Sequence, residues 1–267
     1  MNIHVINDCR DQNARLRQEA RLGAYFPGVN IIFAGVRTDI EAGFLLVDLL
    51  DALDGNPGVI LVNVAPRNGA AKKHINGTPF GKIQIGNTII FASVDGATLS
   101  ALSKVADGVL NIYNIPDVVP HLTDDVQLQQ HIVRTQFRSL EFLPRVAKAV
   151  VRDRKLVPAQ AVNLKAHCGE NHVGAVAFVD CFGNLKTTCL PEEIGFEPDK
   201  SVEILIGGHK HLITCFERLK DIPDWTLGLT VGSSGLGQHR FLEIMLQGGN
   251  ARKQLGVKVG ATIHLAK

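Results

Sequence analysis

The sequence predicts a two-domain α/β protein, with a layered α/β domain over residues 1–155 and a smaller, β-rich, barrel-like domain over residues 165–267. Up to about residue 150, short apolar runs rich in β-branched residues alternate with helical patterns, which is typical of layered α/β domains. Residues 151–165 contain Pro158 and mixed polarity, so we place the domain boundary there. Beyond it, short strands separated by Gly, Pro and Asn indicate a small barrel.

In the first domain, a helix is expected at 13–25, and another at 39–53, where Thr38 or Asp39 caps a segment with leucines on its buried side. A third helical stretch, 127–150, contains Pro144, which bends it or starts a new helix. Apolar, β-branched runs between turn residues predict strands at 3–6, 30–34, 59–64, 82–85, 88–92 and 109–113.

In the second domain, the apolar run 173–179 predicts a buried strand that leads into an acid. Near the C-terminus, a short helix ended by Gly256 precedes a closing strand. Further strands are expected at 202–206, 211–216, 227–231 and 241–245.

Composition excludes several classes of partner. The formal charge of the 267 residues is +2 and no basic run is dense, so we expect no nucleic-acid partner. No apolar run approaches the roughly 20 residues that span a bilayer, so we expect no membrane partner. Five scattered cysteines do not resemble a disulfide framework, which favours the reducing cytoplasm.

Three groups of residues have metal-binding or phosphate-binding chemistry without the expected spacing. His167, Cys168, Glu170 and His172 do not match known zinc spacings, and two histidines at 209 and 211 lack a third ligand, so we predict no metal site. The glycine-rich run 232–237 lacks the Lys-Ser/Thr ending of a P-loop.

Acids follow two predicted strands. Asp180 and Asn184 can together accept hydrogen bonds from a ligand ammonium group beside Phe182, or Asp180 can simply cap a Gly-Asn hairpin. Asp8 and Asp11 follow the first strand, where acids meet a ribose or a metal, or cap the next helix.

Several runs resemble one enzyme family. Residues 180–187 are similar to its Asp-x-Phe-Gly-Asn-Leu-x-Thr motif, and 233–235 with 241–244 to its Asn-Ser-x-Gly-Tyr-Leu-x-Ile motif. Residues 247–251 are similar to its Gln-Gly-Asn-Ala run, and 7–8, 38–43 and 93–96 match its N-terminal half in outline. The family is that of the S-adenosylmethionine hydroxide adenosyltransferases, which includes fluorinating and chlorinating enzymes.

The resemblance implies an adenosyl ligand, S-adenosylmethionine, as substrate and no separate cofactor. It also implies a homotrimer with a pocket between the N-terminal domain of one subunit and the C-terminal domain of its neighbour. Asp8 and Asp11 would meet the ribose, Asp180 and Asn184 the methionine ammonium, and Phe182 the sulfonium channel. The remaining expected substrate-binding residues are Thr38, Asn68, Ser233, Ser234 and Gly248.

The chain departs from the family at its catalytic set of Asp, Arg and His. Ala65 replaces the acid, Lys72 and Lys73 replace the arginine pair, and Phe137 or Arg138 stands in place of the histidine. Water needs a base or a cation to lose its proton, and Ala65 supplies neither, so Lys73 and Arg138 are the catalytic candidates.

Three interpretations of function therefore stay open. The first is an adenosyl-cleaving or adenosyl-transferring enzyme, a hydrolase or transferase that gives adenosine and methionine. The second is a binding protein for S-adenosylmethionine or a nucleoside, without turnover. The third is a halogenase, in which Ser139 of a Phe-Arg-Ser segment donates to a halide.

Overall fold

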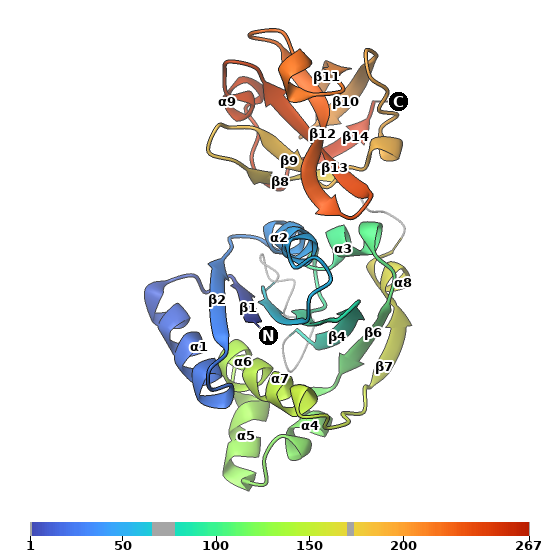
Figure 1. The fold of residues 1–267 in the computed structure, drawn as a ribbon. Coiled ribbons are helices and arrows are strands. Elements are labelled where there is room, and N and C mark those ends of the chain that lie inside the picture. The colour runs from blue at the N-terminus through green and yellow to red at the C-terminus, as the bar shows by residue number, and fades with distance from the viewer. Residues whose placement is uncertain (1, 66–77, 170–173, 267) are drawn as a thin grey trace. The chain divides into compact units, whose positions relative to one another are not determined.

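The computed structural model describes residues 2–65, 78–169 and 174–266. The chain divides into two compact units. The first contains Met1–Leu46 and Leu53–Glu170, and the second contains Val47–Ala52 and Asn171–Lys267. The mixed α/β class and the C-terminal barrel predicted from the sequence are both confirmed (Figure 1).

The first unit is built on a seven-stranded sheet in the order β2-β1-β3-β5-β4-β6-β7. The first four of these are parallel, and the remaining three are added antiparallel. Gly86, with a φ of +55°, and Asn87 make the two-residue turn between β4 and β5. The strands are β1 (Asn2–Asn7), β2 (Asn30–Gly35), β3 (Gly58–Asn63), β4 (Phe80–Ile85), β5 (Thr88–Ser93), β6 (Val109–Tyr113) and β7 (Gln160–Asn163).

Helices surround this sheet (Figure 1). Alternate residues of a strand face opposite sides, so Ile3 and Val5 of β1 enter one core with Leu22 of α1 and Val146 of α7. Pro144 stands in the first turn of α7, as expected of a proline that begins a new helix. The helices are α1 (Gln12–Tyr25), α2 (Asp39–Ala52), α3 (Ser100–Val105), α4 (Ile115–Val118), α5 (Val126–Arg134), α6 (Arg138–Glu141), α7 (Leu143–Val151) and α8 (Leu164–Cys168).

The second unit contains a closed barrel in the order β10-β11-β12-β13-β9-β8-β14. Its core holds Val176, Leu185, Ile204, Ile213 and Ile244, all nearly inaccessible to solvent. The strands are β8 (Gly174–Val179), β9 (Leu185–Thr187), β10 (Ser201–Ile206), β11 (His209–Cys215), β12 (Leu227–Leu236), β13 (His239–Leu246) and β14 (Thr262–Leu265). Helix α9 (Ala251–Leu255) ends at Gly256 in the left-handed region, as expected.

Two segments differ from expectation. The linker expected at 151–165 contains β7, which pairs with β6, so this segment and α8 are part of the first unit. Strand β12 runs on past Val231, where the strand was expected to end, through a bulge into the glycine-rich run, which pairs with β13.

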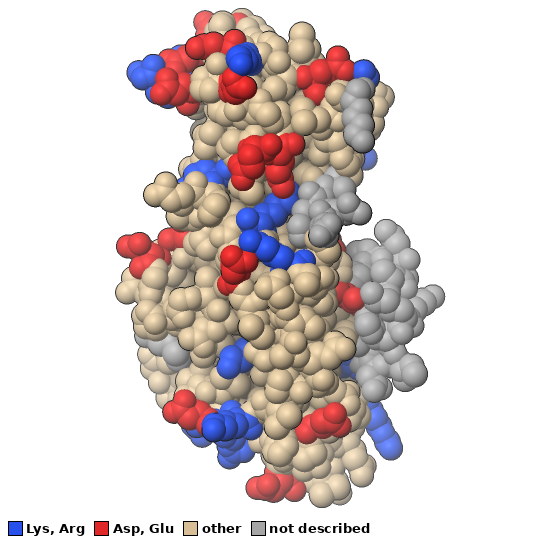
Figure 2. All heavy atoms as spheres, turned by 90° about the vertical axis from the view of Figure 1, so that its right-hand side faces the viewer, with Lys and Arg blue, Asp and Glu red and all other residues tan. Residues whose placement is uncertain are grey.

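Surface composition agrees with the balanced charge. The face drawn in Figure 2 carries basic and acidic groups of both signs, separated by larger uncharged areas. No helix within the described ranges is long and apolar enough to cross a membrane. All five cysteines are free thiols.

Candidate functional site

Polar side chains gather where the parallel strands of the first unit end. The Asn63 side-chain amide at the end of β3 donates to Asn7 Oδ1 at the end of β1, at 3.3 Å, and Asn7 Oδ1 also accepts from the Cys9 backbone at 2.9 Å. The Ser93 hydroxyl at the end of β5 donates to the carbonyl of Val64 at 3.0 Å. Carboxyl ends of adjacent parallel strands are the usual ligand-binding edge of an open α/β sheet.

Asp8 lies at this edge and holds the start of the following loop. Its Oδ2 accepts a hydrogen bond from the backbone N–H of Ala65 at 3.1 Å, and its own N–H donates to the carbonyl of Asn63 at 3.2 Å. Ala65 is exposed and is the position at which the sequence lacks an expected acid. The Asp8 carboxylate therefore lies next to position 65. The family resemblance leads one to expect a second acid at that position, and this chain has Ala65 there.

A cavity of about 200 Å³ lies at the same end of β1. Two residues expected in the site, Asp11 and Ser139, line it together although they are far apart in sequence. Asp11 also caps α1, since its carboxylate accepts from the Ala14 N–H at 3.0 Å, so the capping role considered for this acid applies. The other lining residues are Asn7, Cys9, Asn13, Ala14, Arg17, Gln18, Phe137 and Leu140.

Gln18 lines this cavity and carries an unpaired side-chain oxygen. Its side chain is only 3% exposed, yet its Oε1 accepts no hydrogen bond in the described part of the chain. A buried acceptor without a donor costs about 1–3 kcal/mol. This oxygen is itself inaccessible to solvent, so Gln18 lines the cavity through its other atoms.

Arg138 is a second buried polar group without a partner. Its Nε is inaccessible to solvent and has no hydrogen-bond partner among the described residues. Burial lowers the pKa of its guanidinium. Arg138 is not one of the residues that line the cavity, whereas its neighbours Phe137 and Ser139 both are.

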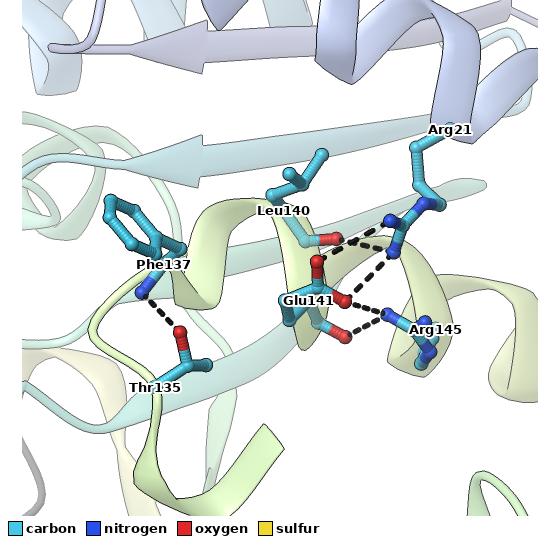
Figure 3. A network of polar contacts seen from close by, with 6 residues as sticks. All are labelled: Arg21, Thr135, Phe137, Leu140, Glu141 and Arg145. Atoms are coloured by element: carbon cyan, nitrogen blue, oxygen red, sulfur yellow. Dashed lines mark hydrogen bonds and ion pairs between the residues drawn. The ribbon is translucent and has the colours of Figure 1, made fainter. Parts of the chain in front are cut away.

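A polar network fixes the short helix α6 that carries Ser139 (Figure 3). Arg21 of α1 donates to Glu141 Oε2 at 2.9 Å and to the Leu140 carbonyl at 3.4 Å, and Arg145 donates to Glu141 Oε2 at 2.8 Å. Burial raises the pKa of Glu141, but the two guanidinium partners outweigh it and lower the pKa overall. The wall of the cavity formed by α6 is thus held from two other helices.

Thr38 and Asp39 shape the beginning of α2. The Thr38 hydroxyl accepts from the Glu41 N–H at 3.1 Å and so caps the helix, as the sequence predicts. Asp39 Oδ2 accepts from the Ala97 N–H at 2.8 Å, which ties the helix start to the loop after β5. Capping uses the Thr38 hydroxyl as an acceptor and leaves its proton available to a ligand.

Two expected site residues, Asn68 and Lys73, lie outside the described residues, as do Arg67 and Lys72. The same holds for Glu170 and His172 of the candidate zinc group. Its described member His167 makes a 2.8 Å hydrogen bond to the carbonyl of Val94. Within the described ranges, no group of three or more His, Cys, Asp or Glu residues could hold a metal ion.

In the second unit, the turn after β8 is organised around Asp180. Its Oδ1 accepts from the backbone N–H groups of Phe182 and Asn184, both at 2.9 Å, and its Oδ2 accepts from Asn184 Nδ2 at 2.9 Å. The hairpin interpretation is therefore right about the local role of Asp180. A carboxylate has about four acceptor positions, so three internal bonds leave capacity for one ligand donor.

Gly183 allows this turn to pack against α9. Its φ is +89°, and a Cβ at this position would lie 2.1 Å from Asn250 Nδ2. The Gly183 carbonyl accepts from the Arg252 N–H at 3.0 Å. Phe182 is 73% exposed beside this turn, so its ring is available as an apolar contact surface.

Gly248 lies near an aromatic residue that sequence reasoning missed. A Cβ at Gly248 would be 3.8 Å from the Trp225 ring, which is 74% exposed. Trp225 has a φ of +61°, and its N–H donates to the Gln247 carbonyl at 2.8 Å. As the single tryptophan of the chain, exposed on a barrel, it was the available sequence signal.

Ser233 and Ser234 lie in the bulged part of β12. The Ser234 hydroxyl donates to Asp48 Oδ2 at 2.9 Å, and the Ser233 carbonyl accepts from Arg240 at 3.0 Å. Burial raises the pKa of Asp48, against the Ser234 and Gly235 hydrogen bonds. The Ser234 hydroxyl proton is therefore already used, while Ser233 remains exposed.

Lys186 and Glu243 form an ion pair on the strands next to the Asp180 turn, with a 3.2 Å separation. Burial raises the pKa of Glu243, and Lys186 opposes this shift. The charges of Asp180 and Asp48 raise it further.

Comparisons with known proteins give a family match for the C-terminal domain and similar folds for the whole chain. Residues 174–264 match the family model of the SAM hydroxide adenosyltransferase C-terminal domain. No curated protein matches the chain. An uncharacterised conserved protein from Thermotoga maritima shares the fold with a TM-score of 0.65 and 20% identity, over 99% of this chain and 100% of that one. A conserved hypothetical protein from Thermus thermophilus does so with a TM-score of 0.53 and 18% identity, over 99% of both chains.

Proposed function

We propose that this chain, whose residues 174–264 match the family model of the SAM hydroxide adenosyltransferase C-terminal domain, binds S-adenosylmethionine and cleaves or transfers its adenosyl group, giving adenosine and methionine in the hydrolytic case. The observation that carries this proposal is the Asp180 turn, in which three internal hydrogen bonds fix a carboxylate that keeps one acceptor position free. A carboxylate held in this way is suited to a ligand ammonium group.

The two units supply complementary chemistry for such a ligand. Asp180 and Asn184 would hold the amino acid end beside Phe182, and Asp8 and Asp11 would hold the ribose hydroxyls at the end of β1. Gln18 lines the same cavity as Asp11 and would offer its side-chain amide to a hydroxyl or an amine. We further propose a homotrimer in which the two sets meet across a subunit interface. The five free thiols fit a cytoplasmic location.

In this reaction the protein has to position the nucleophile and activate it. An oxygen nucleophile forms a bond to the 5′ carbon while the carbon–sulfur bond breaks. The electron pair of the broken bond stays on sulfur and neutralises the sulfonium as methionine leaves. Water must also lose a proton, which requires a base or a cation nearby. Lys73 and Arg138 are the proposed cations, and Ser139 is the proposed hydroxyl donor at the cavity.

The second candidate function is binding without turnover. It is favoured by Ala65, whose side chain can take no proton and whose N–H already occupies Asp8. In this case the same residues bind S-adenosylmethionine or a nucleoside, and the protein reports or stores the ligand without chemistry.

Calorimetry with S-adenosylmethionine and with adenosine, combined with chromatography for released adenosine and methionine, separates the candidates. Tight binding without product contradicts the enzyme and supports the binding protein. Failure of both ligands to bind contradicts both functions. A parallel incubation with chloride and fluoride tests for a halogenated nucleoside, the product expected of the family's halogenating branch.

A further inference from the structure

A second cavity, of about 230 Å³, lies in the first unit and shares no lining residue with the cavity at the end of β1. Four of its lining residues are cations, namely Arg145, Lys148, Arg152 and Arg154. None of the described residues that line it is acidic; the others are Tyr25, Leu122, Thr123, Leu128 and Ala149. The cavity therefore collects positive charge in a chain whose overall charge is only +2.

Three of the four cations are held in place. Arg145 is fixed by hydrogen bonds to the carboxylate and the carbonyl of Glu141, at 2.8 and 2.6 Å (Figure 3). The Lys148 ammonium lies 4.5 Å from the centre of the Tyr25 ring. Arg154 donates to the carbonyl of His121 at 2.9 Å. A site whose groups are already ordered loses less conformational entropy when it binds.

The charges are only partly compensated. Glu141 pairs with Arg145, but it is shared with Arg21. Lys148, Arg152 and Arg154 form no ion pair with a described residue, and a ring or a carbonyl neutralises no charge. Like charges gathered in one cavity repel each other, and an anion bound between them removes that repulsion.

We propose that this cavity is an anion site, formed around Lys148 and Arg152, for a small molecule that carries a phosphate or diphosphate group. Arginine forks match the geometry of phosphate oxygens, and lysine adds a point charge. A volume of about 230 Å³ is smaller than the roughly 300 Å³ of the smallest drug-sized pockets, so it suits a compact group. Leu122 and Leu128 offer an apolar wall to the organic part of such a ligand.

The test is titration calorimetry of the full chain with inorganic phosphate, inorganic diphosphate and ribose 5-phosphate. The variant is Lys148→Gln with Arg152→Gln, which spares Arg145 because that residue supports α6. The control is Arg252→Gln with Lys253→Gln, two exposed cations on α9 that remove the same charge. Thermal unfolding by circular dichroism verifies that both variants fold.

We expect at least one probe to bind, with about tenfold or greater loss in the Lys148 and Arg152 variant and an unchanged affinity in the control. Tighter binding of ribose 5-phosphate than of phosphate identifies an organic phosphate as the ligand, and equal affinities identify the free anion. No binding of any probe, or equal binding by variant and wild type, overturns the site.

Discussion

Asn184 Nδ2 donates to Asp180 Oδ2 at 2.9 Å, and this bond orients both side chains of the turn after β8. Because the amide nitrogen faces Asp180, the amide oxygen of Asn184 faces away from it and accepts no hydrogen bond from a described residue. The turn thus offers two acceptors, one charged and one neutral, in a fixed relationship.

Replacing Asp180 separates the two roles of its carboxylate. Asp180→Asn keeps an oxygen for the backbone N–H groups of Phe182 and Asn184 but removes the charge. The Asn184 amide can turn over so that its oxygen accepts from the new NH2 group, and the turn should persist. We expect S-adenosylmethionine to bind more weakly by about 1.5–3 kcal/mol, with adenosine unaffected. Asp180→Ala should also destabilise the barrel. Calorimetry with both ligands checks this, and equal losses for the two would contradict an ammonium contact.

Gly183→Ala should destabilise the protein more than the same change at another glycine. Both Gly183 and Gly195 have a positive φ, +89° and +64°, so alanine is strained at each by about 1–2 kcal/mol. Only at Gly183 would the new Cβ meet Asn250, whereas at Gly195 nothing lies within 4 Å. Denaturant unfolding of the two variants measures the difference, and equal stabilities would show that Asn250 moves aside freely.

Glu141→Gln should reduce stability at neutral pH by about 3 kcal/mol, because it leaves two partly buried guanidinium groups without their carboxylate. The pKa of Glu141 is lowered in the folded state, so its stabilisation is present above the ordinary value of 4.5 and is lost as pH falls through the folded value. The difference in the free energy of unfolding between variant and wild type should therefore become smaller below about pH 4.5.

The control for Glu141 is Glu19→Gln, which breaks the more exposed pair with Arg15 and should cost less than about 1 kcal/mol. Urea unfolding at a series of pH values measures both variants. If the free energy of unfolding differs between the Glu141 variant and wild type by the same amount at every acidic pH, the carboxylate charge contributes nothing to stability.

Gln18→Met should stabilise the protein and weaken the nucleoside complex. Methionine fills a similar space without a buried, unpaired oxygen, and we expect a gain of about 1 kcal/mol in the free energy of unfolding. Adenosine affinity should fall if the side-chain amide of Gln18 is a ligand contact. The matched change Gln127→Met, at an exposed residue of α5, should leave affinity unchanged. Unchanged adenosine affinity in the Gln18→Met variant would show that Gln18 does not contact the ligand.

Most of the fold could be predicted because buried strands have strong apolar patterns. The strands β1, β3 and β5 are nearly continuous apolar runs, so their positions were clear. The strand β7 was missed because Gln160–Asn163 is a short, mostly exposed edge segment that is defined by pairing with β6. Its place in the first unit follows from that pairing and not from its composition.

The site was only partly predictable, for a related reason. Asp11 and Ser139 could be named from motifs, but their common cavity depends on how α6 packs near the start of α1. Gln18 gave no sequence signal, since a buried glutamine in a helix differs from an exposed one only through its surroundings. The second cavity likewise joins Tyr25 to cations beyond residue 140, which no local pattern connects.

The closed barrel and the open sheet differ in how they expose the chain to self-association. Every described barrel strand has a neighbour on both sides, whereas the sheet ends at β2 and β7 with unpaired backbone groups. Such edges recruit strands from other molecules. β7 is short, so β2, with the 42% exposed Ile32, is the edge at which aggregation of concentrated protein should begin. A lysine at position 32 is therefore the simplest change for keeping the protein monodisperse during crystallisation or NMR.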